Sequence, residues 1–535
     1  MSDDRTESRS GERASFRKDL GRWSLMAASM GGVIGSGWLF AGMYAARASG
    51  PAAILSWLIG GASILVIALI YAELSAARPE AGGTIRYPAY TNGTLAASLV
   101  SWSTWLLYTA NPPTEASAAV QYLSYFWPGL YVDGALSGAG VAVAIGLMVL
   151  FVVVNYFGVR WFARLNNGIT AIKVFVPLLT VLALIFTSFH PANFTGEESG
   201  GFAPYGISGA LGAITTAGIL FAYTGFEQAI ALGEEGSSPV RDVPRAVLTV
   251  MGASIVIYVG LQVAFLGGVT PRMLSRGWDH VSLNSPFADL AVAANLTWLS
   301  WLLFVDSVIS PSGSSLSFTA SSARLVYAMG ENGFFPGIFR RLHPRFGVPH
   351  YALLLNFLVG LAFLLPLPSW QSLVSVMGVL VGFAYATGAV SITVFRHQGI
   401  VGGIRIPAMR MLAPAGFIIS TLISYWAGWQ RLHIAIPMLL AGAVVYAISC
   451  IHYPKPREDL RGGVWLVMLI LSMLIVSYLG SFGGRGLLNA PWDSVVMGAI
   501  SLLVYLLGTR SGFWYTSRPF WQKEILPQLQ RDHRR

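Results

Sequence analysis

Cysteine and charge are both scarce in this chain of 535 residues. A single cysteine, Cys450, rules out an intrachain disulfide and suggests no thiol chemistry. Only 11% of the residues are charged, against about 25% in soluble domains. More than half of the chain, 54%, is hydrophobic, and the mean hydropathy is +0.61. This composition is typical of a polytopic membrane protein and excludes a set of soluble domains.

Motifs for enzymatic chemistry are also missing. The eight histidines form no HExxH or similar ligand set, which argues against a metal enzyme. The main glycine-rich stretch has the spacing GxxGxG rather than GxGxxG and follows no soluble strand, so it is no dinucleotide fingerprint. No repeated filter sequence suggests a channel. We therefore expect neither an enzyme nor a protein with a cofactor or metal.

Apolar runs near the roughly 20 residues that a bilayer requires recur along the chain. They predict an all-α membrane protein with about fourteen spans, near residues 22–46, 52–76, 94–126, 136–157, 166–188, 208–233, 246–269, 290–328, 350–367, 371–395, 410–429, 433–452, 463–481 and 492–508. Polar tails are expected at 1–20 and 509–535.

Basic residues predict the orientation of these spans. With the N-terminus inside, the segments expected in the cytoplasm hold most loop arginines and lysines, for example Arg160, Arg340 and Lys455. The opposite loops hold few. By the positive-inside rule both tails should be cytoplasmic. The net charge of +10 is explained by this topology and does not indicate a nucleic-acid partner.

Four glycines within GGVIGSGWLF, residues 31–40, interrupt the first span. Each glycine costs up to about 1 kcal/mol against alanine in a helix interior. A helix broken at membrane depth should line a cavity or be buried in protein, where its free N–H groups can hold an anion. The alternative is that these small residues only let helices pack closely.

A second interruption, FAYTGFE at residues 221–227, lies about 190 residues further on in another apolar span. It combines Gly225 with the polar Thr224 and the ionisable Glu227. Two glycine-interrupted spans in corresponding positions of two halves indicate a transporter binding site.

Three stretches together resemble motifs of the amino acid–polyamine–organocation transporter superfamily. Residues 31–40 resemble its first-helix glycine motif, and FAYTGFEQAIALGEE, residues 221–235, resembles its sixth-helix motif. SFTASSARLVYAMGENGFFP, residues 317–336, resembles the end of its eighth helix and the following loop. The sixth-helix motif includes the acidic pair Glu234 and Glu235 at its expected cytoplasmic end.

This resemblance implies a leucine-transporter-like fold. Residues 21–400 would form two inverted five-helix repeats, with helices one and six unwound where the substrate binds. Residues 401–508 would add four helices outside this core. Some resemblance to bacterial aspartate–proton symporters makes aspartate or glutamate a candidate substrate.

The resemblance also implies a substrate site at the two interruptions. The substrate carboxylate would meet N–H groups of the first interruption, and the ammonium would meet carbonyls of both, as half-helix ends favour. Either Tyr223 or Phe226 could close over the substrate, or these rings could pack in the core. The implied site residues are Ile34, Gly35, Ser36, Gly37, Tyr108, Asn111, Phe221, Ala222, Tyr223, Thr224 and Gly225.

Lys173 lies in an apolar span, where a lysine costs about 3 kcal/mol on insertion scales. In sodium-independent members of the superfamily, a lysine on the fifth helix occupies the place of a sodium ion, and Lys173 matches that position. It would bridge helix one to helix eight and exchange protons. Its expected polar partners are Ser312, Ser314 and Ser315, within a serine run that also includes Ser310 and Ser317. The alternative is a lysine that snorkels to the interface.

Three carboxyl groups are further candidates. Glu227, the last residue of the second interruption, could carry protons or bind a substrate group, and the alternative is a structural carboxyl hydrogen-bonded to broken backbone. Glu115 follows Pro112 and Pro113 and either couples protons or forms a buried structural pair. Asp306, in the middle of a long apolar run, is the weakest candidate and could pair with a buried cation.

We therefore expect a secondary transporter that imports amino acids by alternating access in a bacterial cytoplasmic membrane. Proton symport is preferred, and a sodium-independent amino acid or amine exchanger is the alternative. The expected partners are an amino acid, protons and the lipid bilayer. The sequence indicates neither which amino acid is carried nor the oligomeric state.

Overall fold

A computed structural model describes residues 21–531 except 80–82, 158, 197–198, 233–235, 237 and 453–456. This part of the chain is mostly helical, and its strands are one short antiparallel hairpin, β1 (Tyr131–Val132) and β2 (Ala135–Leu136). The predicted acidic pair Glu234 and Glu235 and the predicted tail 1–20 lie outside the described residues.

The α-helices follow one another along the chain with short connections. Up to residue 340 they are α1 (Arg22–Val33), α2 (Gly37–Ser49), α3 (Ala53–Ala77), α4 (Gly83–Leu123), α5 (Gly138–Phe157), α6 (Val159–Thr187), α7 (Ala192–Thr195), α8 (Gly206–Thr216), α9 (Ile219–Tyr223), α10 (Gln228–Ala231), α11 (Pro239–Gly268), α12 (Pro271–Leu274), α13 (Pro286–Ala293) and α14 (Thr297–Glu331). Beyond residue 340 they are α15 (His350–Leu364), α16 (Trp370–His397), α17 (Met409–Trp426), α18 (Trp429–His452), α19 (Arg457–Leu479), α20 (Trp492–Thr516) and α21 (Leu526–Arg531). Single turns of other helix types are η1 (Gly50–Ala52), η2 (Pro128–Leu130), η5 (Trp278–His280), η6 (Gly337–Arg340) and η7 (Trp521–Ile525).

Eight helical stretches within the described residues are long and apolar enough to cross a bilayer. Two of them are α11, with a mean hydropathy of 2.0 in its most apolar window, and α16, with 1.9. The chain is therefore a multi-pass membrane protein. The long helix α14 is less apolar, because its middle carries Asp306 and a run of serines. The total of about fourteen spans, the inverted repeats and the orientation stay predictions.

Both predicted interruptions break their helices. The first span divides into α1 and α2, separated by residues 34–36, and the second into α8, α9 and α10. The two breaks lie against each other, since a Cβ on Gly37 would come 2.7 Å from Ala222 Cβ. Only a glycine at position 37 lets α2 approach α9 this closely.

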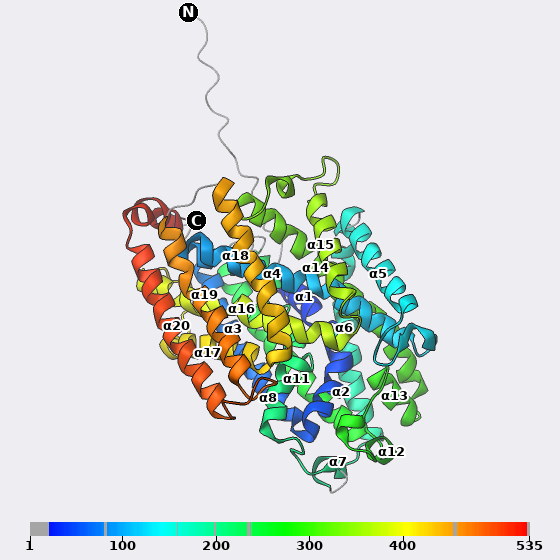
Figure 1. The fold of residues 1–535 in the computed structure, drawn as a ribbon. Helices are drawn as coiled ribbons and strands as arrows, with labels where there is room; N and C mark the ends of the chain where they lie inside the picture. Colours follow the sequence, from blue (N-terminus) through cyan, green and yellow to red (C-terminus); the bar gives the residue numbers. More distant parts are fainter. Residues whose placement is uncertain are drawn as a thin grey trace, which may run out of the picture.

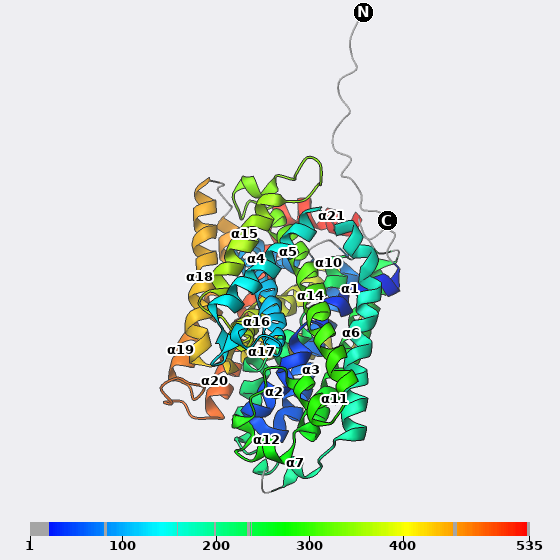
Figure 2. The ribbon, with the colours of Figure 1, turned by 90° about the vertical axis from the view of Figure 1, so that its right-hand side faces the viewer.

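The C-terminal helices α17–α20 lie along one side of the molecule, and α5 and α13 lie on the other (Figure 1). The helix α21 stands at the end opposite to α7 and α12, which the perpendicular view also shows (Figure 2). The helix α20 continues to Thr516, beyond the predicted end of the last span near residue 508, and the polar cytoplasmic tail of residues 509–535 stays a prediction. The helix continues because Tyr515 is buried and donates to Asp459 Oδ1 at 2.7 Å.

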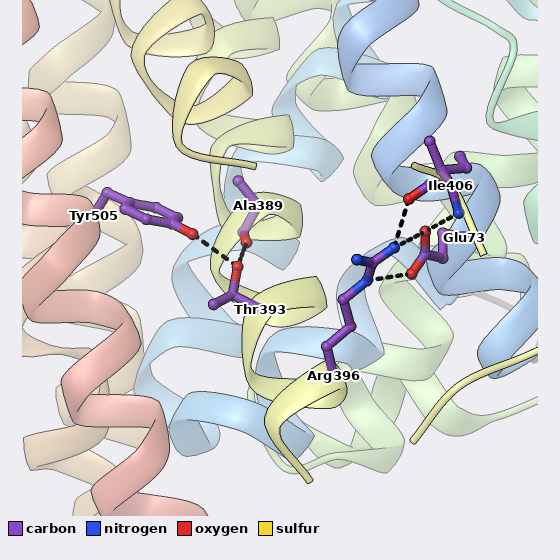
Figure 3. A network of polar contacts seen from close by, with 6 residues as sticks. All are labelled: Glu73, Ala389, Thr393, Arg396, Ile406 and Tyr505. Carbon is purple, nitrogen blue, oxygen red and sulfur yellow. Dashed lines mark hydrogen bonds and ion pairs between the residues drawn. The ribbon is translucent and has the colours of Figure 1, made fainter. Parts of the chain in front are cut away.

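The helix α16 links the early helices to the C-terminal ones (Figure 3). Arg396 forms a two-fold ion pair with the buried Glu73 of α3, at 2.6 and 2.7 Å, and also donates to the Ile406 carbonyl at 2.8 Å. Less than one turn before Arg396 in α16, the hydroxyls of Thr393 and of Tyr505 in α20 are 2.7 Å apart. These contacts fix the end of α16 relative to α3 and α20.

Candidate functional site

The first break leaves three backbone carbonyls without their usual helical N–H partners, and each accepts a hydrogen bond from another helix. Such groups must be satisfied by protein where no water is present. The donors come from α6, α14 and α11: Lys173 Nζ donates to Gly31 O at 2.6 Å, Ser314 Oγ to Gly32 O at 3.4 Å, and Tyr258 OH to Val33 O at 2.9 Å.

The free amide of the same break faces a carboxylate of the protein itself. Ser36 N donates to Glu115 Oε2 at 2.7 Å, and Ser36 is the N-cap of α2, where the helix dipole favours a negative charge. Gly35 leaves room for this contact, because a Cβ there would collide with Glu115 Oε1. The carboxylate of Glu115 thus bonds to an amide that was predicted to meet the substrate carboxylate, and substrate binding there stays a prediction.

At the second break, a carboxylate of the protein, that of Glu227, also accepts a hydrogen bond from a backbone amide. Gly225 N donates to Glu227 Oε2 at 2.9 Å, while the Phe221 carbonyl accepts from both the amide and the hydroxyl of Thr224. The Glu227 carboxylate also faces the phenols of Tyr108 and Tyr385. This geometry corresponds to the capping role weighed for Glu227, and proton transfer by Glu227 stays a prediction.

Lys173 is fully buried, with 0% of its surface exposed, so it does not snorkel to the interface. Its ammonium bonds to α1 and lies against α14, where a Cβ on Gly313 would come 3.1 Å from Nζ. The predicted serine partners differ from the structure: the carbonyl of Gly31 accepts the hydrogen bond because the break frees it. Ser314 instead faces Gly32 and Glu115, Ser315 Oγ has no partner in the structure, and Ser312 is half-buried.

The two aromatic residues weighed as gates pack elsewhere. The ring of Tyr223 lies between Trp57 and Tyr258, and its hydroxyl donates to the Trp57 carbonyl at 3.3 Å. Phe226 packs on Tyr385, with ring centroids 5.4 Å apart. Both positions correspond to the core-packing alternative.

The remaining predicted residues surround the breaks. Ile34 and Ala222 are buried at the first and second break, and Tyr108 and Asn111 come from α4, where Asn111 Oδ1 is buried without a partner. Asp306 accepts from Ser310 of its own helix at 2.8 and 2.9 Å. Sequence reasoning missed Trp370, Tyr385 and Tyr258, since aromatic residues are frequent in apolar spans and no local pattern distinguishes these three.

Paired, buried breaks in the helices of a multi-pass membrane protein are typical of a transporter. A family model described as amino acid permease matches residues 20–474. The chain therefore belongs to the amino acid permease family, and it is an amino acid transporter and not an enzyme.

Two named relatives match nearly the whole chain, and a third matches a shorter part of it. The glutamate/serine transporter AimA of Bacillus subtilis is 38% identical over 516 residues, 93% of this chain and 94% of that protein. The aspartate-proton symporter of Bacillus subtilis is 35% identical over 514 residues, 94% and 98% of the two chains. The cationic amino acid transporter 4 of Mus musculus is 30% identical over 396 residues, 72% of this chain and 60% of that protein.

Proposed function

We propose that this protein imports amino acids with protons by alternating access across a bacterial cytoplasmic membrane. The observation that supports proton coupling is the contact between Ser36 N and the Glu115 carboxylate at 2.7 Å. A similarity to an aspartate-proton symporter over 94% of the chain supports the same proposal.

Competition between the Glu115 carboxylate and the substrate carboxylate for the N-terminus of α2 couples proton binding to substrate binding. An amino acid carries a carboxylate, and the Ser36 N–H at the N-cap of α2 is the group proposed to bind it. The neighbouring Gly35 N–H already donates to the Val33 carbonyl at 3.1 Å. Glu115 and the substrate carboxylate cannot both bind the Ser36 N–H while ionised, because like charges at short range in a buried site repel strongly. Protonation of Glu115 frees the Ser36 amide for the substrate carboxylate, so substrate binding and proton binding favour each other.

Lys173 acts on the opposite side of the same break. Its ammonium satisfies the Gly31 carbonyl and holds α1 against α6 and α14, the role that a sodium ion has in related sodium-coupled transporters. The Lys173 and Glu115 charges attract each other, so a proton gained by Glu115 weakens the hold of Lys173 on that side.

The transport core is proposed to consist of two inverted five-helix repeats in residues 21–400. Two broken helices that lie against each other support this topology. The distribution of loop arginines supports cytoplasmic termini. The four helices of residues 401–508 lie outside this core.

Acidic amino acids and serine are the first substrates to test. Two relatives that match over more than 90% of this chain are named for glutamate, serine and aspartate. The site's backbone groups recognise the amino and carboxyl groups that all amino acids share, so a panel of amino acids is needed.

Uptake into proteoliposomes tests this function. Purified protein receives labelled glutamate, aspartate and serine, beside a cationic and an apolar amino acid, under an inward proton gradient. A second set of vesicles contains unlabelled substrate and has no gradient. Accumulation that an ionophore abolishes supports symport, whereas uptake only into preloaded vesicles, at any pH, would show the alternative, an exchanger.

A further inference from the structure

Trp370, the first residue of α16, covers the first break. Its indole Nε1 donates to Ser36 Oγ at 2.7 Å. The ring stacks on Tyr44 of α2, with centroids 5.6 Å apart and an interplanar angle of 15°, and lies 5.1 Å from the ring of Phe40. The side chain is completely buried. A tryptophan with its N–H bonded inside a helix break is a specific contact and more than general packing.

The same indole also contacts the second broken helix. Its edge meets the ring of Phe221 of α9, with centroids 6.1 Å apart at 82°. Gly218, between α8 and α9, has φ +84°, and a Cβ there would come 2.5 Å from the indole. A glycine at this position therefore both forms the turn and leaves the space that the indole fills. One side chain thus connects the two broken helices.

We propose that Trp370 is a gate residue, whose indole closes the substrate site on the side of α7 and α12 and must leave both breaks before an amino acid enters from there. This proposal rests on the transport function above. By the predicted orientation this side is extracellular.

Ser36 connects this gate to the proposed proton site. The Ser36 hydroxyl accepts from Trp370, its amide donates to Glu115, and its side chain faces the same carboxylate. A change in what Ser36 binds therefore alters the hydrogen bond between Ser36 and the indole. Outside the core, the backbone just before Trp370 is held by the hairpin, because Leu136 N donates to the Pro368 carbonyl at 2.7 Å.

The test variant is Trp370→Phe, which keeps an aromatic ring and removes the N–H donor. Trp105→Phe is the matched control: its indole is also buried and donates to Asn356 Oδ1 at 2.7 Å, but it joins α4 to α15 away from both breaks. A net hydrogen bond changes an equilibrium by about fivefold, so this is the expected shift toward the open gate.

Thiol labelling measures the gate without transport. The single native cysteine is removed by Cys450→Ser, and Ala217→Cys places a buried thiol beside Gly218. A membrane-impermeant maleimide is applied to right-side-out and to inside-out vesicles. Trp370→Phe should raise the labelling rate about fivefold from the outside only, and Trp105→Phe should leave it unchanged.

The proposal is overturned if Trp370→Phe leaves the labelling rate unchanged. It is also overturned if the variant raises the labelling rate from the inside. Ser36→Ala removes the acceptor instead of the donor, so it should raise outside labelling to a similar extent, and the double variant should add little; additive effects would count against the proposed bond. Thermal unfolding and gel filtration check that each variant is folded. A wild-type protein that carries no amino acid would refute the proposed function, while the labelling still tests the gate.

Discussion

Replacing Glu115 by glutamine tests the proposed coupling most directly. The amide has nearly the same shape as the carboxylate and can still accept the Ser36 N–H, but it carries no charge. The variant therefore resembles the protonated state of Glu115 at every pH. The carboxylate of a substrate would no longer compete with an ion for the N-terminus of α2.

The size of the effect follows from the contact that is weakened. A hydrogen bond to an ionised carboxylate, such as that of 2.7 Å from Ser36 N to Glu115, is worth about 1.5–3 kcal/mol, and a neutral one about 0.5–1.5 kcal/mol. The exchange weakens the contact by about 1–1.5 kcal/mol, so the Glu115→Gln protein should bind substrate about 5- to 10-fold more tightly than wild type at high pH. At low pH, where Glu115 of the wild type is protonated, the two proteins should bind equally.

The assay is equilibrium binding of a labelled amino acid that the uptake panel identifies, from pH 5 to pH 8. Wild-type affinity should rise as the pH falls, because binding takes up a proton, and the affinity of Glu115→Gln should be flat. Glu227→Gln is the comparison, since Glu227 caps the other break. A wild-type affinity that does not change with pH would refute this reasoning. So would a pH dependence of affinity that is lost in Glu227→Gln and kept in Glu115→Gln.

Three further predictions concern contacts around the breaks and α16. Lys173→Met leaves a buried carbonyl without its donor, so gradient-driven accumulation should be lost and the free energy of unfolding should fall by about 1.5–3 kcal/mol, measured by uptake and thermal unfolding in detergent. Gly37→Ala places a methyl group 2.7 Å from Ala222 Cβ; such overpacking costs about 1–3 kcal/mol, and uptake should be abolished. Arg396→Gln leaves the buried Glu73 carboxylate unpaired, which should cost about 3–5 kcal/mol of stability and lower the unfolding temperature.

Each of these predictions has a control within the chain. Gly252→Ala has open space around the new methyl group and should transport like wild type, so equal loss in both glycine variants would exclude a specific contact of Gly37. Arg410→Gln changes an exposed arginine and should leave the unfolding temperature unchanged. Lys523→Met changes an exposed lysine and should leave both accumulation and the unfolding temperature unchanged. Normal accumulation by the Lys173→Met protein would contradict a role of Lys173 in coupling.

The positions of the helix breaks were predictable because backbone preferences act locally. Glycines 31, 32, 35 and 37 weaken one helix, and Gly225 with its polar neighbours weakens another, whatever surrounds them. The buried lysine was also a clear signal, since an ionisable group in an apolar run is costly unless it has a partner. Family membership followed from the same stretches and is confirmed by the match over residues 20–474.

The partners of these groups were less predictable. The serines near Lys173 were expected to bind it, yet the broken helix offers a freed carbonyl, and Gly31 O accepts instead. The last membrane span was predicted to end near residue 508, and the helix α20 continues to Thr516, where the buried Tyr515 donates to Asp459. Tertiary contacts overrode local composition in both cases.

By itself the sequence determined that this protein is a helical membrane transporter with two glycine-interrupted spans and a lysine in an apolar span, since hydropathy, glycine content and motif are properties of short stretches. Only the tertiary structure decided what fills the interruptions. Glu115 is 79 positions from Ser36, Lys173 is 142 from Gly31, and Trp370 is 334 from Ser36. Which distant side chain satisfies a given backbone group depends on how all the helices pack together, and no local pattern records that choice.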